Sequence, residues 1–247
     1  MLPKDRIDYI CDWISNYACQ SSKNTFGLVI GVSGGIDSAV TSTLCAKTNL
    51  KTIVVSMPIR QNEFQHNLSL EHIEWLKKNY NNVEDFTINL DNVFQSFQST
   101  LNEFNSDLAY ANSRSRLRML TLYQIAQSTN SLVVGTGNKV EDFGIGFYTK
   151  YGDGGVDISP IADCYKTEVW EMGKKLEISN NIIEAKPTDG LWDDSRDDEE
   201  QIGLSYDQLE EAMSDSQSQF FEKYNKIRNP NLHKMIPIPI CKFKKIL

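Results

Sequence analysis

The sequence predicts an α/β protein in which a mostly parallel sheet carries helices on both faces. Short apolar runs rich in β-branched residues alternate along the chain with longer stretches of helical periodicity. Two of these runs end in glycine, as strands do where a ligand approaches the carboxyl edge of a parallel sheet. No internal repeat or linker composition divides the chain, so we expect a single domain over residues 1–247.

The individual elements follow from the spacing of apolar residues. An N-terminal helix is predicted over residues 4–20, because its isoleucines fall on one stripe. The segment 26–46 begins with an apolar run, turns at Gly34 and Gly35, and continues as a helix from Asp37. Further strands are predicted at 51–60, 85–90 and 131–137, further helices at 66–79, 100–127, 163–177 and 205–228, and an extended tail at 236–240.

Composition and charge narrow the classes of function. The chain has 247 residues, of which 40% are hydrophobic and 23% charged, and its net charge is −8. An acidic balance argues against a broad nucleic-acid surface, and no apolar run approaches the ~20 residues that span a bilayer. The five cysteines form no CxxC pair, which favours reduced thiols and a cytoplasmic protein over a disulfide framework or a zinc site (Cys11, Cys19, Cys45, Cys164 and Cys241).

The glycine turn that follows the first strand predicts a phosphate site. Glycines let the backbone approach an oxyanion, and the N-terminus of the next helix favours negative charge. Ser33 and Ser38 add hydroxyl donors to this turn, whereas the carboxylate of Asp37 would repel a phosphate. A cation between the carboxylate and the phosphate removes that repulsion, so the sequence predicts Mg²⁺ here. The alternative is a tight strand-to-helix turn capped by the aspartate.

A second polar segment, Gly135–Glu168, follows the last predicted strand. It carries glycines, carboxylates and lysines where a core segment would be apolar, a composition typical of a loop that holds a polar ligand. A solvated glycine-rich loop is the alternative. Near residue 192, a tryptophan followed by acidic residues to 200 predicts a solvated acidic loop.

These two segments resemble a known family. SGGIDS resembles the SGGxDS signature of the PP-loop ATP pyrophosphatases. The segment GTGNKVE…TKYGDGG.D.SPI…KTE closely resembles the ammonia-dependent NAD synthetases, and the match runs in order from about Gly27 to Pro237. The resemblance implies a Rossmann-like fold of the adenine nucleotide α-hydrolase type, no glutaminase domain, and a homodimer that shares the nucleotide site across its interface.

The resemblance also implies roles for particular residues. Asp37 and Glu141 would ligate Mg²⁺, while Lys166 would neutralise charge near the α-phosphate. Asp157 would contact the substrate and is a candidate general base, which completes the implied catalytic set. ATP would be held by Gly31, Val32, Ser33, Gly34, Gly35, Ile36, Asp37, Ser38, Thr136, Lys166 and Thr188, and the nicotinic acid nucleotide by Arg116, Lys150, Asp157, His233 and Lys234.

The implied reaction amidates a nicotinate carboxylate with ammonia through an acyl-adenylate, consuming ATP and releasing AMP and pyrophosphate. Conversion of deamido-NAD to NAD is the main hypothesis, and conversion of nicotinate mononucleotide to nicotinamide mononucleotide is the alternative. A tRNA-modifying thiolase or lysidine synthetase of the PP-loop class needs a basic RNA surface, which this acidic chain lacks. A non-catalytic ATP-binding module, which would not need two Mg²⁺ carboxylates, is a further alternative.

Overall fold

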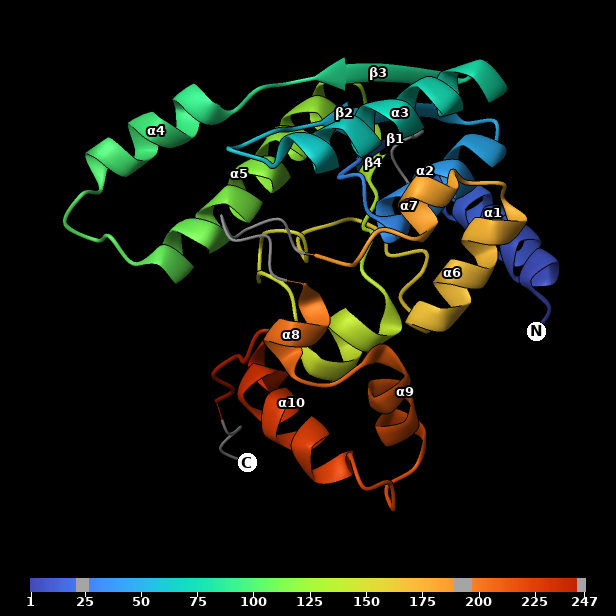
Figure 1. The fold of residues 1–247 in the computed structure, drawn as a ribbon. Coiled ribbons are helices and arrows are strands. Elements are labelled where there is room, and N and C mark those ends of the chain that lie inside the picture. Colours follow the sequence, from blue (N-terminus) through green and yellow to red (C-terminus); the bar gives the residue numbers. More distant parts are fainter. Residues whose placement is uncertain (21–26, 189–196, 244–247) are drawn as a thin grey trace.

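The computed structural model describes residues 1–20, 27–188 and 197–243. These residues form a four-stranded parallel sheet in the order β3-β2-β1-β4 (Figure 1). The α/β fold with a parallel sheet is therefore confirmed. The strands are β1 (Gly27–Gly31), β2 (Lys51–Ser56), β3 (Val83–Thr87) and β4 (Ser131–Val133).

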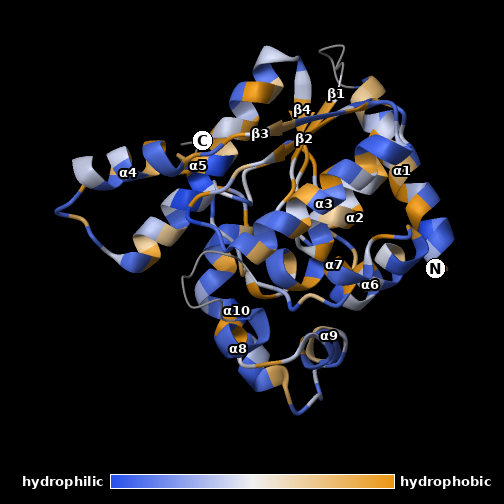
Figure 2. Cartoon of the chain, turned by 45° about the horizontal axis from the view of Figure 1, so that its top comes forward, coloured by the Kyte–Doolittle hydropathy of each residue, from blue (hydrophilic) through white to orange (hydrophobic). Residues whose placement is uncertain are grey.

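The two faces of the sheet carry different helices because successive strand residues point to opposite faces. Leu28 and Ile30 of β1 pack into one apolar cluster, and Val29 between them packs into another. Figure 2 shows β1, β2 and β4 as mostly hydrophobic and the surrounding helices as mixed in character, whereas the edge strand β3 is partly exposed. The first face is covered by α1 (Pro3–Gln20), α2 (Ile36–Lys47), α3 (Glu63–Asn79), α6 (Lys166–Lys175) and α7 (Asn180–Ile183), the second by α4 (Asp91–Thr100) and α5 (Asp107–Ser128).

A third apolar cluster lies outside the sheet. It contains the π-helix η1 and the helices near the C-terminus, which Figure 1 shows grouped at the end of the molecule opposite β3. The elements are η1 (Lys139–Ile145), α8 (Asp198–Ile202), α9 (Tyr206–Ser214) and α10 (Phe221–Met235). No helix in the described ranges is long and apolar enough to cross a membrane.

Two long helices expected from the sequence are each divided in two. The stretch 100–127 contains the end of α4 and most of α5, because Ser106 caps a new helix by accepting a hydrogen bond from the N–H of Ala109. The stretch 205–228 is divided by a turn in which Ser218 N–H donates to Asp215. The capping residue Ser106 and the polar run at 215–219 were the available sequence signals for these breaks.

The acidic loop expected near 192–200 lies partly outside the described residues. Residues 189–196 are not described, but Asp197 caps the short helix α8 by accepting a hydrogen bond from Glu200 N–H at 2.8 Å. Asp198, the first residue of that helix, is buried rather than solvated. The end of the acidic stretch is therefore part of the folded structure.

Glycine is required at position 34 because of backbone conformation and close packing. Its φ is +93°, in the left-handed region, and a Cβ atom there would overlap the backbone oxygen of Gln65 and lie 3.0 Å from Ser69 N. Gly35 is different, since its φ is −86° and a Cβ would meet nothing closer than Ser33 Oγ at 3.5 Å. The turn thus brings the start of α2 against the start of α3.

Gly34→Ala should therefore lower the free energy of unfolding by about 2 kcal/mol or more, through left-handed strain and backbone overlap. Gly35→Ala is the matched control and should cost less than about 1 kcal/mol, as expected for alanine at a helix N-cap. Urea unfolding of both variants measures the difference. Equal losses would contradict the packing described for Gly34.

A buried histidine joins α3 to α2. The ring of His72 is 1% exposed, and its Nε2 lies 3.0 Å from Ser42 Oγ. The ring also stacks on Trp75 with a centroid distance of 5.6 Å. Burial lowers the pKa of His72 to about 4, so the folded protein holds a neutral imidazole.

Stability should consequently fall as the pH falls from 6.5 towards 4. The unfolded chain binds a proton on this histidine near pH 6.5 and the folded protein does not, so acid favours unfolding in that window. Between pH 7.5 and pH 5 the loss attributable to His72 should be about 2 kcal/mol. His72→Gln removes this contribution, so a pH series of urea unfolding should be flatter for the variant by that amount. Parallel pH profiles would exclude His72 as the source.

Candidate active site

A cavity of about 860 Å³ opens at the carboxyl ends of β1, β2 and β4. Its lining includes the glycine turn after β1, the loop after β2, the residues after β4, and parts of η1 and α5. Ligands of parallel sheets occupy this position, because the loops of neighbouring strands converge there. The position agrees with the sequence prediction, which placed both glycine-rich exits at one edge.

The glycine turn is rigid and open to the cavity. Ser33 N–H donates to Ser38 Oγ at 3.2 Å, and that hydroxyl donates to Gly35 O at 2.9 Å. From the neighbouring loop, Gln61 Nε2 donates to Ser33 O at 3.2 Å. The N-cap residue of α2 is Gly35, which has no side chain to cap the helix, so the first turn of α2 is suited to bind an anion.

The centre of the site is a lysine held between two carboxylates. Lys166 is 2% exposed, and its Nζ lies 2.6 Å from Asp37 Oδ2 and 2.7 Å from Glu141 Oε1. Asp37 lies in the first turn of α2, Glu141 lies on the π-helix η1, and Lys166 is the first residue of α6. The three residues that the sequence analysis assigned to metal and phosphate chemistry therefore meet in space.

The charges of this triad depend on one another. Burial alone would lower the pKa of Lys166, but Asp37 and Glu141 outweigh it and raise that pKa. Burial likewise favours a raised pKa for Glu141, yet Lys166 and hydrogen bonds from Lys166 and Tyr206 lower it. For Asp37, burial is the larger effect and raises the pKa. Lys166 therefore remains positively charged, and both carboxylates interact with this one charge.

Asn138 was missed as a site residue although it belongs to the segment GTGNKVE. It is fully buried, and its Nδ2 donates to Asp37 Oδ1 at 3.0 Å. Its Oδ1 accepts the N–H groups of Val140 and Glu141, each at 3.0 Å, and so caps η1. One side chain thus fixes the orientation of Asp37 and the start of the helix that carries Glu141. An asparagine directly before a helix was the available signal.

Tyr206 and Asp198 form a second layer behind Glu141. The buried Tyr206 hydroxyl lies 2.6 Å from Glu141 Oε1 and 3.3 Å from Asp198 Oδ2. Tyr206 also meets the Trp170 ring edge to face, at a centroid distance of 5.6 Å. Tyr206 lies 65 residues beyond Glu141 and in no motif, so local sequence offered no signal for it.

The backbone carbonyls at the C-terminal end of η1 accept hydrogen bonds from side chains on one face of α10. Tyr224 hydroxyl donates to Gly144 O at 3.1 Å, and Asn231 Nδ2 donates to Ile145 O at 3.0 Å. Lys234 Nζ donates to Gly146 O at 2.8 Å and to Tyr148 O at 2.9 Å. Arg228 also donates to the carbonyls of Phe143 and Gly144. The C-terminal helix therefore sets the position of the element that bears Glu141.

The donor set at the triad fits Mg²⁺. Asp37 and Glu141 present hard carboxylate oxygens towards a common lysine beside the glycine turn. Within the described ranges no three His, Cys, Asp or Glu side chains cluster as a complete metal site. Two carboxylates completed by phosphate oxygens and water are a usual Mg²⁺ environment.

The other predicted ATP residues also line this cavity. Thr136 follows β4, and Thr188 lies at the end of the described segment before residue 189. The substrate residues are divided. Lys234 lines the cavity, whereas Arg116, Lys150, Asp157 and His233 are absent from its wall.

Arg116 is exposed, and its Nε donates to Lys150 O at 3.3 Å. Arg114 and Arg118 each lie two residues from Arg116 on α5. Two residues turn a helix by about 200°, so both arginines lie on the opposite side of α5 from Arg116. Accordingly Arg118 lines the cavity and Arg114 is buried, while Arg116 faces away. Lys150 Nζ in turn donates to His233 O at 2.9 Å.

Asp157 has structural partners on both carboxylate oxygens. Oδ2 accepts the N–H of Val133 at 2.8 Å, and Oδ1 accepts the Tyr123 hydroxyl at 3.2 Å. These contacts fix the chain beside β4. In this arrangement the carboxylate holds the sheet edge, and its expected contact with substrate stays a prediction.

Two further carboxylates line the cavity without having been predicted. Asp153 Oδ1 accepts the Ser115 hydroxyl at 2.6 Å and the N–H of Thr149 at 3.0 Å. Burial, followed by the charges of Asp153 and Glu141, raises the pKa of Asp142 well above its usual value. Burial raises the pKa of Asp153 as well, so both carboxyl groups hold a proton more readily than exposed aspartates do.

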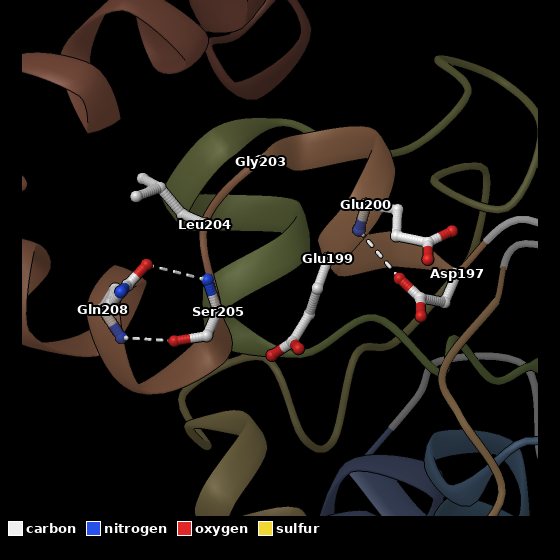
Figure 3. A pocket seen from close by; sticks show the side chains of 7 residues that line it. All are labelled: Asp197, Glu199, Glu200, Gly203, Leu204, Ser205 and Gln208. Atoms are coloured by element: carbon white, nitrogen blue, oxygen red, sulfur yellow. Dashed lines mark hydrogen bonds between the residues drawn. The ribbon is translucent and has the colours of Figure 1, made fainter.

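A second hollow, of about 340 Å³, lies where α8 meets α9 (Figure 3). Its polar groups are already paired. Ser205 Oγ accepts Gln208 N–H at 3.3 Å, while Gln208 Oε1 accepts Ser205 N–H at 3.1 Å. Figure 3 shows these contacts beside that of Asp197 with Glu200 N–H. The polar groups drawn in this hollow therefore serve to cap α8 and α9.

Comparison with known proteins agrees with this geometry. The profile of the NAD synthase family matches residues 6–241. A curated relative, the NH(3)-dependent NAD(+) synthetase of Methanosarcina mazei, is 39% identical over 189 residues, 76% of this chain and 73% of its own.

Solved structures agree as well. The NMN synthetase of Francisella tularensis has a TM-score of 0.89 and 33% identity, covering 98% of this chain and all of its own. The NH3-dependent NAD synthetase of Campylobacter jejuni, in complex with the nitrate ion, has a TM-score of 0.79, 26% identity and the same coverage. The sequence resemblance is confirmed: this chain belongs to the NAD synthase family.

Proposed function

We propose that this chain uses ATP and ammonia to amidate the nicotinate carboxylate of a nicotinic acid nucleotide, with deamido-NAD as the preferred substrate. The supporting observation is the buried Lys166 between Asp37 and Glu141, beside an uncapped glycine turn. The curated relatives are named NH(3)-dependent NAD(+) synthetases, ligases that take ATP as a substrate. A non-catalytic ATP-binding module would not need this carboxylate pair.

In the first proposed step, the nicotinate carboxylate attacks the α-phosphorus of ATP, and the bond to the β-phosphate breaks. The products are an acyl-adenylate and pyrophosphate. The glycine turn would bind the phosphates through N–H groups, with Thr136 and Thr188 as further ATP contacts. Lys166 would stabilise charge that grows on the transferred and departing phosphates.

In the second step, ammonia attacks the activated carbonyl, AMP leaves, and the carboxamide remains. No covalent bond to the protein is needed, so the protein acts by positioning and by charge. Ammonium must first lose a proton, and Asp157 is the candidate base that the family resemblance supplies. The structural use of both its oxygens weighs against that role.

Asp37 and Glu141 would hold Mg²⁺ with the phosphates. When bound, the ion supplies charge neutralisation for the departing pyrophosphate. Lys166 then keeps the two carboxylates at a fixed separation beside the glycine turn.

The nicotinic acid nucleotide would be held by Arg116, Lys150, His233 and Lys234. Arg116 and His233 are exposed, which supports a site completed by a second copy of the chain. We therefore propose a homodimer. We also propose that residues 1–247 form one catalytic domain, that this domain uses free ammonia, and that it acts in the cytoplasm.

A second candidate has the same chemistry with a shorter substrate. The neighbour with a TM-score of 0.89 and full coverage is named NMN synthetase. That likeness supports nicotinate mononucleotide as substrate, giving nicotinamide mononucleotide. The two candidates differ in the adenylate half of the acceptor alone.

Turnover with the two acceptors should distinguish these candidates. AMP and pyrophosphate release is measured with ATP, Mg²⁺ and ammonium, using either deamido-NAD or nicotinate mononucleotide. We expect a higher kcat/KM for the dinucleotide. A higher value for the mononucleotide would favour the second candidate, and no release with either acceptor by folded protein would exclude amidation.

Asp37→Asn and Glu141→Gln should each lower turnover at least ~10²-fold, because each removes one preorganised group that stabilises phosphate charge. Asp163→Asn is the matched control, since its carboxylate is 96% exposed and pairs with Lys139 outside the cavity. Turnover is measured across a Mg²⁺ titration, with circular dichroism to verify folding. Wild-type rates in either site variant would contradict the assignment.

A further inference from the structure

Two arginines in the cavity wall have no part in the function proposed above. Arg60 lies in the loop after β2, and Arg118 lies on α5, so they belong to different elements that meet at the cavity. Neither forms an ion pair with any residue in the described ranges. Positive groups without carboxylate partners are notable in a chain with a net charge of −8.

The backbone of Arg60 is held in a conformation that arginine rarely adopts. Its φ is +47°, in the left-handed region. The conformation is fixed from α4, where Asp91 Oδ1 accepts Arg60 N–H at 2.6 Å. Leu90 N–H also donates to Pro58 O at 3.1 Å, which holds the same loop. Such an outlier, held from outside, is typical of functional sites.

The guanidinium groups are placed by an aromatic ring and a backbone carbonyl. Arg60 Cζ lies 5.6 Å from the centroid of the buried Phe94 ring, and Arg114 Cζ lies 5.8 Å from the same centroid. Arg118 Nε donates to Met57 O at 3.0 Å. That bond uses one of five guanidinium donors, so the others remain for a ligand.

Charge in this region favours an anion. Burial, and then the neighbouring charge of Arg114, lowers the pKa of Arg118 to about 10, which still leaves it protonated near neutral pH. The charge of Asp153 opposes this lowering, and Asp153 Oδ1 already accepts hydrogen bonds from Ser115 and Thr149. A bound anion would offset the desolvation of these arginines.

We propose that Arg60 and Arg118 form a phosphate subsite that binds a phosphate group of a nucleotide substrate, beside the glycine turn. Planar guanidinium forks match phosphate oxygens in pairs, and two forks from different elements fix the orientation of the group. The proposal rests on the proposed function for its ligand class. The phosphate belongs to ATP or to the nicotinic acid nucleotide, and each source can be tested separately.

The test measures binding without turnover. Wild type and Arg60→Gln are titrated by calorimetry with ATP and Mg²⁺, and separately with nicotinate mononucleotide, in the absence of ammonium. Loss of a hydrogen bond to a charged group should weaken one of the two ligands about 10- to 100-fold. Weaker ATP binding identifies ATP as the source, and weaker mononucleotide binding identifies the other substrate.

Control variants distinguish an effect of the guanidinium group on affinity from effects of net charge and of impaired folding. Lys174→Gln removes one exposed positive charge from α6, away from the cavity wall, and should leave both affinities within about 2-fold. Arg60→Lys keeps the charge without the fork and should restore part of the affinity. Thermal unfolding is compared for all variants, and Arg118→Gln should weaken the same ligand as Arg60→Gln.

Unchanged affinity for both ligands in Arg60→Gln would overturn the phosphate subsite, as would failure of the wild type to bind either ligand. This outcome is independent of the amidation reaction. If Arg60→Gln weakens a ligand while wild type releases no AMP with either acceptor, the phosphate subsite stands and the proposed amidation fails.

Discussion

The ion pairs between Lys166 and the carboxylates of Asp37 and Glu141 are the interaction on which the site depends. A lysine that is 2% exposed is stable as a cation because two carboxylates lie within 2.7 Å of it. Removing one partner of a buried ion pair typically costs 3–5 kcal/mol. The same contacts join α2, which follows β1 along the chain, to η1 and α6, which follow β4. Because β1 and β4 are neighbours in the sheet, residues 101 to 129 positions apart from Asp37 reach it directly.

The C-terminal helix makes this arrangement possible by completing the hydrogen bonds of η1. A π-helix leaves carbonyls at its end that the following residues do not satisfy, and buried carbonyls need partners. Tyr224, Asn231 and Lys234 supply donors from one stripe of α10, at spacings of three and seven residues. Asn138 completes the opposite end. Glu141 is therefore fixed at both ends of its helix.

Local chemistry explains which parts of the site could be predicted from the sequence. The strand β1 and the glycine turn could be predicted from local sequence. A buried strand favours β-branched residues, and the positive φ in the turn favours glycine. The pairing of Asp37 with Glu141 came from family resemblance, since no spacing rule connects them.

The role of Tyr206 could not be predicted from local sequence, because its contact with Glu141 spans 65 residues. The difference between Arg116 and Arg118 was available from helical geometry, since residues two apart on a helix face opposite sides. The breaks at residues 101–106 and 215–220 have local signals in the sequence, a capping serine in the first and a polar run at 215–219 in the second.

The cavity wall combines opposite charges, and their separation matters for an enzyme with two anionic substrates. Carboxylates of Asp37, Asp142 and Asp153 lie on the wall with Lys166, whose charge is already shared between two of the site's carboxylates. Lys166 is therefore already paired with carboxylates before any phosphate binds. In the proposed function, Mg²⁺ held by Asp37 and Glu141 would supply the additional positive charge for the phosphates. Arg60 and Arg118 lie beyond the triad, after β2 and on α5, where no described carboxylate pairs with them. The two proposals thus differ in the source of positive charge: an added cation would supply it at the triad, and the protein's own arginines would supply it at the phosphate subsite.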